Sequence, residues 1–324
     1  MKAILSERPG PAHTLVLADL PDPVPGPGEV LVDVAAVGLN FFDTLVIEDR
    51  YQHKPVRPFS PGGEFSGRVA ALGAGVTGFA PGDRVAGHLK AGAAREKLVV
   101  PAAMLVPVPD GVSDAAAAGF CVTYGTSLHG LADRAELKPG ETVAVLGASG
   151  GVGQATIEIA KVMGARVIAC ASGAEKLAVC RSLGADEVID YNTEDLKERL
   201  KALTGGKGVD VIFDVVGGSY AEPALRAIAW KGRYLVVGFA AGEIPKIPLN
   251  LTLLKGCDIR GVFWGAAVDR DPAGYQRDMA QLLGWIAEGR LKVLIHGEYP
   301  LAEAAAALDV LSGRKALGKV ILKP

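Results

Sequence analysis

Residues 142–172 read TVAVLGASGGVGQATIEIAKVMGARVIACAS, and this stretch decides the fold. Thr142 to Gly147 is an apolar, β-branched run of strand length, and a glycine-rich segment continues it to Gly153. Gln154 to Met163 carries apolar residues at helical spacing, and Arg166 to Cys170 is a second short apolar run. The stretch therefore predicts a strand, a tight turn, a right-handed crossover helix and a second, parallel strand.

The glycine-rich turn has the pattern Ala148-x-Gly150-x-x-Gly153, with alanine where the usual dinucleotide fingerprint has its first glycine. Close approach of a pyrophosphate to the backbone excludes side chains, while the first N–H groups of the helix offer donors and a positive dipole end. A glycine turn alone would be weak support, but the strand, turn, helix and strand around it favour dinucleotide binding. The candidate contacts are Ser149, Gly150, Gly151, Val152 and Gly153.

The end of the second strand favours NADP(H) over NAD(H). A carboxylate there would bond the ribose 2′-hydroxyl and repel a 2′-phosphate, but residues 170–174 contain none. Ser172 can donate to a phosphate, Lys176 supplies a positive charge, and Tyr191 after the next strand can bond or stack beside it. Glu175 weakens the preference slightly, because it is either a first-turn helix carboxylate or a displaced ribose ligand.

The composition limits the size, the partners and the cellular location that can be expected for this protein. The chain has 324 residues, of which 49% are hydrophobic, so it is long enough for two domains with sizeable cores. A formal net charge of −2 indicates neither nucleic acid nor an anionic membrane as a main partner. The four cysteines are dispersed, and no apolar stretch has the length of a signal peptide core or membrane span. A cytoplasmic location is expected.

The order of elements predicts an α/β protein. Residues 1 to about 119 contain short β-like runs separated by proline and glycine turns. From residue 120 strands alternate with helices, which predicts a doubly wound parallel sheet. A helix is expected near Tyr220 to Trp230, a strand at Tyr234 to Val237, and a last strand at Ile259 to Phe263. Helix and strand patterns then alternate once more to the C-terminus.

Four motifs carry a resemblance to a known family. They are GLNFFD at 38–43, GGEFSGRV at 62–69, FAPGDRV at 79–85 and ASGGVG at 148–153. In this order they resemble the medium-chain dehydrogenase/reductase superfamily, and within it the zinc-free quinone oxidoreductase branch that includes ζ-crystallin. The resemblance runs over the whole chain. It implies a GroES-like, mostly-β catalytic domain from residues 1–119 and 265–324, and a Rossmann NADP(H)-binding domain from residues 120–264.

The same comparison argues against a metal. Zinc alcohol dehydrogenases of this superfamily have a cysteine before the first helix and a histidine before the glutamate of the glycine signature. Those positions are Asn40 and Gly63 here, and the four-cysteine lobe is absent between Asp83 and Pro101. Zinc requires three or four protein ligands, so no metal site is expected.

Two residues are candidates for the catalytic centre. The resemblance places the Asn40 carboxamide beside the nicotinamide, where it would bond the ribose or the acceptor oxygen; it is equally suited to start a helix with Asp43 three residues on. Tyr51 matches a family tyrosine that faces the active site. It either donates a hydrogen bond or a proton to the developing oxyanion, or only shapes the pocket mouth.

Further cofactor contacts are carried over from the family or from strand ends. Thr123 resembles a threonine near the nicotinamide, although a helix-start hydroxyl would also explain it. Arg314 matches a C-terminal basic residue that reaches the 2′-phosphate, although such clusters are usually solvated. Segments that follow the fifth and sixth strands lie at the edge where ligands bind, so their backbone groups are candidates for fixing the carboxamide, while their aromatic side chains are pocket walls or packing. They contribute Gly238, Phe239, Ala240, Phe263 and Trp264.

The sequence thus predicts an NADPH-dependent, zinc-free reductase that passes hydride to a quinone, and a homodimer is implied by the family. An enone or enoyl-thioester reductase is the alternative within the enzyme class, and it needs a proton donor at the α-carbon. A cofactor-binding protein with little catalysis is the alternative outside it.

Overall fold

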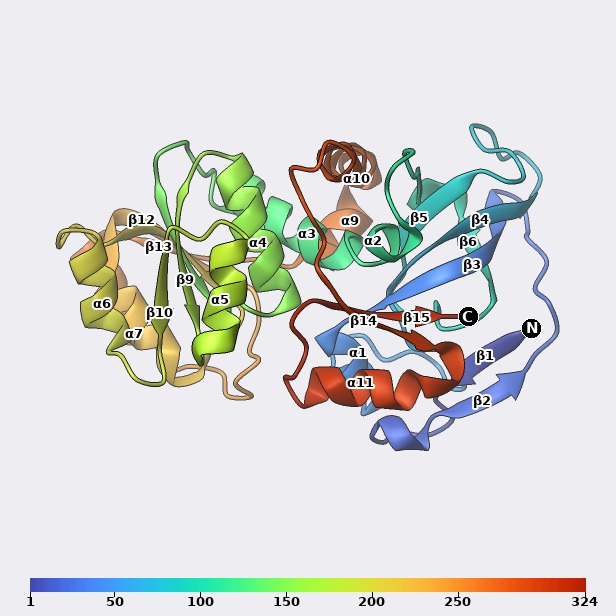
Figure 1. The fold of residues 1–324 in the computed structure, drawn as a ribbon, viewed down its shortest axis with the longest axis horizontal. Coiled ribbons are helices and arrows are strands. Elements are labelled where there is room, and N and C mark those ends of the chain that lie inside the picture. The colour runs from blue at the N-terminus through green and yellow to red at the C-terminus, as the bar shows by residue number, and fades with distance from the viewer. The chain divides into compact units, whose positions relative to one another are not determined.

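The computed structural model describes residues 1–324, and the chain forms two compact units. The first contains Met1–Val122 and Ala267–Pro324, and the second contains Thr123–Ala266. The chain passes between them within helices α3 (Cys121–Leu128) and α9 (Trp264–Arg270). Both chain ends lie in the first unit (Figure 1).

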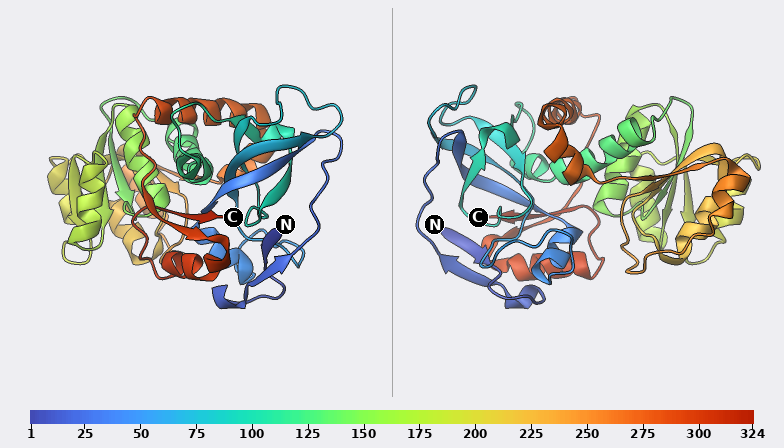
Figure 2. Two further views of the ribbon diagram at one scale, coloured as in Figure 1. Left: turned by 45° about the vertical axis from the view of Figure 1, so that its right-hand side comes forward. Right: turned by 180° about the vertical axis from the view of Figure 1, so that it is seen from behind.

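The first unit is built on a seven-stranded sheet of order β14-β15-β3-β4-β5-β7, with β6 also paired to β3. A two-stranded β1-β2 sheet stands apart from it, and α11 lies beside α1 (Figures 1 and 2). The elements are β1 (Lys2–Leu5), β2 (Val16–Asp19), β3 (Glu29–Leu39), α1 (Phe41–Ile47), β4 (Glu64–Leu72), β5 (Arg84–His88), β6 (Lys97–Pro101), β7 (Leu105–Pro107), α2 (Asp114–Ala118), α10 (Pro272–Ala287), β14 (Ile295–Pro300), α11 (Ala304–Ser312) and β15 (Lys319–Lys323).

The long strand β3 organises this unit. Its valines Val30, Val32 and Val34 alternate into the core, as expected for a strand with one buried face. The closing strand β15 pairs antiparallel with its far end, so that Val320 lies opposite Leu39. This pairing brings the last residues of the chain to the start of α1, about 280 positions earlier in the sequence.

The second unit is a doubly wound parallel sheet of order β10-β9-β8-β11-β12-β13. Helices α4 and α5 cover one face, and α6 and α7 cover the other (Figure 1). The elements are β8 (Thr142–Leu146), α4 (Gly151–Val162), β9 (Arg166–Ala171), α5 (Ala174–Ser182), β10 (Glu187–Asp190), α6 (Leu196–Leu203), β11 (Val209–Asp214), α7 (Ala221–Arg226), β12 (Ile228–Val236), α8 (Asn250–Lys255) and β13 (Asp258–Gly261).

The central strands confirm the predicted α/β class. Val143 to Leu146 of β8 are completely buried, because helices cover both faces of the sheet. The helix expected to reach Trp230 is wrong, since α7 ends at Arg226 and Trp230 lies in β12. Lys231 takes a left-handed conformation with φ of 61° inside this strand, an irregularity that apolar spacing did not indicate. No helix of either unit is both long and apolar enough to cross a membrane.

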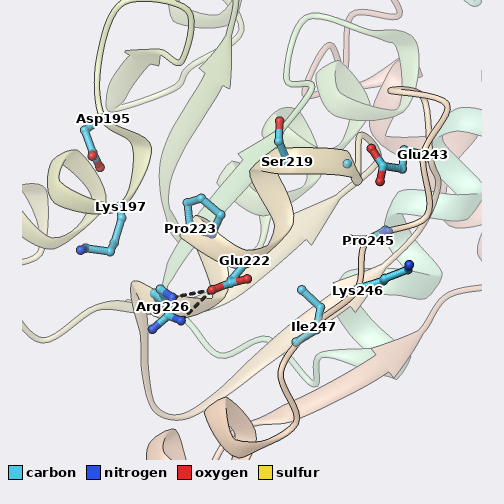
Figure 3. A pocket seen from close by; sticks show the side chains of 11 residues that line it. Asp195, Lys197, Ser219, Glu222, Pro223, Arg226, Glu243, Pro245, Lys246 and Ile247 are labelled. Atoms are coloured by element: carbon cyan, nitrogen blue, oxygen red, sulfur yellow. Dashed lines mark hydrogen bonds and ion pairs between the residues drawn. The ribbon is translucent and has the colours of Figure 1, made fainter.

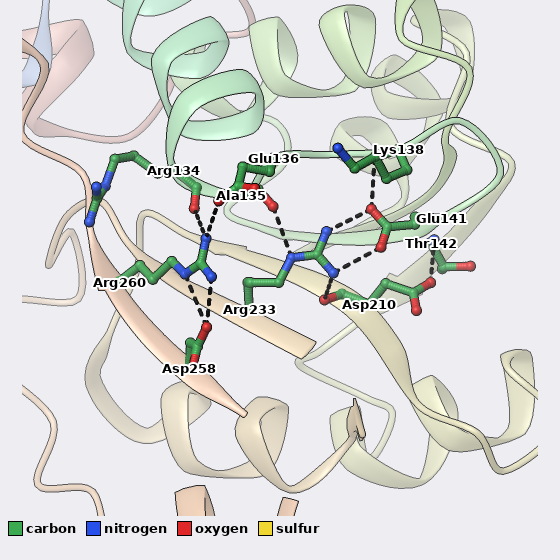
Figure 4. Close-up of polar contacts among 10 residues, drawn as sticks. All are labelled: Arg134, Ala135, Glu136, Lys138, Glu141, Thr142, Asp210, Arg233, Asp258 and Arg260. Atoms are coloured by element: carbon green, nitrogen blue, oxygen red, sulfur yellow. Dashed lines mark hydrogen bonds and ion pairs between the residues drawn. The ribbon is translucent and has the colours of Figure 1, made fainter. Parts of the chain in front are cut away.

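Polar side chains tie the amino-terminal edge of this sheet together (Figure 4). Arg233 of β12 makes a two-pronged ion pair with Glu141, with N···O distances of 2.8 and 2.6 Å, and its Nε donates to the Ala135 carbonyl. Arg260 of β13 donates to Asp258 and to the Arg134 carbonyl. Both arginines thereby hold the segment that precedes β8.

Replacing Arg233 with methionine is expected to lower the free energy of unfolding by about 2 kcal/mol, because it leaves the partly buried Glu141 carboxylate with only the Lys138 N–H as a donor. Replacing Arg226 with methionine breaks the exposed ion pair to Glu222 and should cost about 0.5 kcal/mol. Urea unfolding of the two variants measures the difference. Equal losses would contradict the role given to Arg233.

Candidate functional site

The glycine turn between β8 and α4, where the sequence predicts a phosphate site, has no room for a side chain at Gly147 or Gly153. Gly147 takes φ of +72°. A Cβ on Gly153 would stand 2.3 Å from the Gly147 carbonyl oxygen. The helix begins at Gly151, and the first N–H groups of a helix have no acceptor within it. The turn therefore fits a pyrophosphate, because a tight glycine backbone leads directly into the free N–H groups of a helix.

Most of the predicted cofactor residues gather at one edge of the second unit. All six strands are parallel, so the segments that follow them share the carboxyl edge of the sheet. Ligands bind at this edge in doubly wound folds. The residues brought to it are Ser149, Gly150, Gly151, Val152 and Gly153 after β8, Ser172 and Lys176 after β9, Tyr191 after β10, Gly238, Phe239 and Ala240 after β12, and Phe263 and Trp264 after β13.

The ends of β9 and β10 form the candidate ribose side. Ser172 and Lys176 are half-buried, and the Tyr191 ring lies 4.4 Å from that of Tyr220. Sequence reasoning missed Asp190, whose carboxylate accepts from the N–H groups of Gly173 and Asn192 at 3.1 Å each. These two bonds use the Asp190 carboxylate to hold the turn. In the sequence, the signal for this residue was its position at the end of an apolar strand.

The segments after β12 and β13 differ in the hydrogen bonding of their N–H groups and in the exposure of their aromatic side chains. The N–H groups of Gly238 and Ala240 donate to carbonyls at the end of β11, at 3.3 and 3.1 Å, so these two donors serve the fold. Phe239 and Phe263 are exposed, which suits a pocket wall. Trp264 is buried, and its indole lies so close to Gly125 that a Cβ there would stand 2.6 Å away.

Thr123 and Arg314 complete the predicted cofactor set. Thr123 is buried in α3, and its carbonyl accepts from the Ser127 hydroxyl at 2.9 Å. Arg314 belongs to the first unit and lies exposed in the turn after α11, with φ of 55°.

Asn40 lies at the start of α1 in the first unit. Its N–H donates to the Asp43 carboxylate at 2.8 Å, and its carbonyl accepts from the Asp43 N–H at 3.0 Å. Its carboxamide faces two charged side chains instead of the helix: Oδ1 accepts from Lys319 at 2.6 Å, and Nδ2 donates to Glu64 at 2.8 Å. Sequence reasoning missed both partners.

Tyr51 follows α1 in an irregular segment of the same unit. Its ring stacks on Phe42 with centroids 5.4 Å apart, and Phe42 in turn contacts Gly63, the residue before Glu64. Arg57 ties the segment back to α1 through the Asp49 carboxylate at 2.7 Å and the Ile47 carbonyl at 2.9 Å. Partial burial, with a smaller contribution from Asp43, raises the pKa of Tyr51, so the phenol remains a donor at neutral pH.

Asp43 is the most perturbed acid near Asn40. Burial, assisted by the nearby Glu64 charge, raises the pKa of its carboxyl to about 7, against the opposing effect of two backbone N–H donors and Lys319. A group that changes protonation near neutral pH beside candidate catalytic residues is a recognised mark of an active site.

No group of three or more His, Cys, Asp or Glu side chains is arranged to hold a metal ion. The His88 ring lies against the Gly63 carbonyl, with Nδ1 2.8 Å from the oxygen, and burial lowers its pKa. The four cysteines are buried and unpaired, and burial raises the pKa of each thiol.

A separate hollow of about 610 Å³ opens between α6, α7 and residues 243–247 (Figure 3). Its charges are balanced, with three cationic and three acidic side chains, and Arg226 is already paired to Glu222. None of the predicted cofactor residues lines it.

Comparison with known proteins identifies the class. Residues 26–110 match the alcohol dehydrogenase GroES-like domain, and residues 151–288 match the zinc-binding dehydrogenase domain. The chain belongs to the medium-chain dehydrogenase/reductase family of oxidoreductases, with a GroES-like domain and a Rossmann domain.

Its relatives include quinone oxidoreductases. A quinone oxidoreductase-like protein 2 homolog from Nematostella vectensis is 40% identical over 300 residues, which cover 92% of this chain and 82% of the relative. The structure of Escherichia coli quinone oxidoreductase complexed with NADPH has a TM-score of 0.92 at 29% identity, covering 100% of both chains. A mycobacterial protein complexed with NADPH has a TM-score of 0.91 at 33% identity, again over 100% of both chains.

Proposed function

We propose that this protein is a zinc-independent, NADPH-dependent quinone reductase. The observation that carries the proposal is the glycine turn between β8 and α4, where a side chain on Gly147 or Gly153 would clash and which fits a pyrophosphate, together with the lack of an acidic residue at positions 170–174 after β9. The likeness to quinone oxidoreductases supports a quinone as the acceptor. The absence of histidine and cysteine at positions 63 and 40 supports chemistry without zinc.

The reaction transfers one hydride and one proton to the quinone, which becomes a hydroquinone while NADPH becomes NADP⁺. The bound cofactor supplies the hydride, so the protein supplies binding and orientation. Asn40 is assigned to the nicotinamide ribose or the acceptor oxygen. Tyr51 shapes the pocket mouth, since solvent can protonate the hydroquinone anion.

An acceptor panel tests the substrate class. With NADPH as donor, 1,4-benzoquinone and 9,10-phenanthrenequinone are compared with an alkyl enone and crotonyl-CoA. We expect the highest kcat/KM for a quinone. A higher value for the enone or the thioester would replace the proposal with the alternative reductase, and Tyr51→Phe would then be expected to abolish that activity by removing the proton donor.

Replacing Lys176 with alanine is expected to raise the KM for NADPH roughly 10-fold, because the 2′-phosphate loses a charge-assisted hydrogen bond. The KM for NADH should not change, since NADH has no phosphate there. Lys207→Ala, an exposed lysine just before β11, is the matched control. Equal changes in both KM values would remove Lys176 from the proposed phosphate site.

We further propose that the protein is a homodimer. The strand β13 ends the parallel sheet, and its outer edge has no partner strand in this chain. Exposed apolar side chains accompany it: Trp230, Leu253, Leu254 and Ile259. Pairing with a second copy would cover an edge that proteins otherwise protect.

Ile259→Lys is expected to shift the protein to monomers in sedimentation velocity experiments, because it places a charge on that edge. Val24→Lys alters an apolar residue of the other unit that is more exposed than Ile259, and it should leave the dimer intact. A wild-type monomer would contradict the proposal.

The cytoplasm is the proposed location, in line with four unpaired, buried cysteines.

A further inference from the structure

A buried ion pair surrounds the side chain of Asn40. The Lys319 ammonium lies at the start of β15, and its side chain is only 6% exposed. It donates to the Leu39 carbonyl at 3.0 Å, to Asn40 Oδ1 at 2.6 Å and to Glu64 Oε1 at 2.7 Å. An ammonium has three hydrogens, so these contacts use all of its donors.

Glu64 is completely buried and completes the arrangement. Its Oε1 accepts from Asn40 Nδ2 as well as from Lys319, and its Oε2 accepts from the Val122 N–H at 2.9 Å. Two glycines leave space for the charged side chains. A Cβ on Gly38 would stand 2.8 Å from the Glu64 stem, and a Cβ on Gly119 would stand 3.1 Å from the Lys319 stem.

The two charges determine which way the Asn40 carboxamide faces. An ammonium only donates and a carboxylate only accepts, so the carbonyl oxygen must face Lys319 and the NH₂ group must face Glu64. The flipped amide would place N–H against ammonium and oxygen against carboxylate. One N–H of the NH₂ group is used by Glu64, and the other is held in a fixed direction.

Stability alone gives no reason for this pair. Burying two charges costs desolvation, and apolar residues of similar volume often stabilise a core equally well. The strand neighbour Val320 is itself fully buried and apolar. Because every Lys319 donor is used inside the protein, neither charge is placed to reach a substrate directly.

We propose that Lys319 and Glu64 are positioning residues that hold the Asn40 carboxamide in the orientation needed for hydride transfer. The inference rests on the proposed role of Asn40 in that reaction. Both residues act through Asn40. A hydrogen-bonding group is preoriented only when neighbouring side chains hold it in place.

A double-mutant cycle tests the proposal. E64Q/K319M removes both charges together, so that no buried charge is left unpaired. We expect a protein with near wild-type thermal stability whose kcat falls on the order of 10- to 100-fold, because the amide is no longer held in place. In the Asn40→Ala background, the same double exchange should cause no further loss. Lys323→Met, in the same strand but exposed, should leave kcat unchanged.

The outcomes separate the two claims. If Asn40→Ala leaves kcat unchanged, the assigned role of Asn40 fails and the inference fails with it. If Asn40→Ala lowers kcat while E64Q/K319M is fully active, or if their losses simply multiply, only the positioning role is overturned. If E64Q/K319M does not fold, Gly119→Ala takes its place in the cycle, because it displaces the Lys319 stem while both charges remain.

Discussion

Replacing Gly153 with alanine is expected to weaken NADPH binding on the order of 100-fold and to lower the free energy of unfolding by about 2 kcal/mol. The added Cβ would stand 2.3 Å from the Gly147 carbonyl oxygen and 2.6 Å from the Ala148 Cα. Both are backbone atoms, so the turn itself must move. A displaced turn loses the close backbone approach on which pyrophosphate binding depends.

Gly150→Ala separates the two effects. Its Cβ would have its nearest neighbour at 3.4 Å and its φ of −78° suits any residue, so the free energy of unfolding should change by less than about 1 kcal/mol. NADPH affinity should still fall, since the methyl group is added directly before the helix start that is proposed to bind the phosphates. Gly284→Ala, with nothing within 4 Å, is the control outside this unit. Isothermal titration with NADPH and urea unfolding measure both quantities, and unchanged affinity in both turn variants would contradict the site.

The stability of the protein is expected to fall by about 3 kcal/mol between pH 4 and pH 7 through Asp43 alone. The folded pKa of this carboxyl is about 7, raised from 3.8 mainly by burial. In this window the folded protein therefore holds a proton that the unfolded chain has released. Stability from this group is complete below pH 3.8 and is lost as the pH rises through 7.

Asp43→Asn removes that titration. The variant loses one acceptor for the N–H groups of Asn40 and Gly62, so it starts less stable at pH 4. Its free energy of unfolding should then fall less steeply with pH than that of the wild type. Asp271→Asn, at an exposed helix start, should retain the wild-type slope. Parallel curves for Asp43→Asn and wild type from pH 4 to 8 would contradict the buried, neutralised carboxyl.

The sequence alone predicted the Rossmann unit well, because its signals are local. The glycine turn, the buried strand at 142–146 and the helix after it are neighbours in the chain, and the structure confirms them. The helix expected to reach Trp230 failed because a short apolar run has the same spacing in a helix and in a buried strand.

The surroundings of Asn40 could not be predicted in the same way. Glu64 and Lys319 are 255 residues apart in the chain, and they meet only because β15 pairs with β3 beside β4. The available signal was a charged residue at the start of each apolar strand. Such residues are usually solvated, and only the pairing of the strands shows that these two are buried.

Zinc-independent reduction by NADPH is tested by the rates of NADPH and NADH oxidation with 9,10-phenanthrenequinone, before and after treatment with a metal chelator. We expect turnover that prefers NADPH and is unchanged by the chelator. Preference for NADH would contradict the phosphate site at Ser172 and Lys176, and loss of activity after chelation would contradict the zinc-independent mechanism.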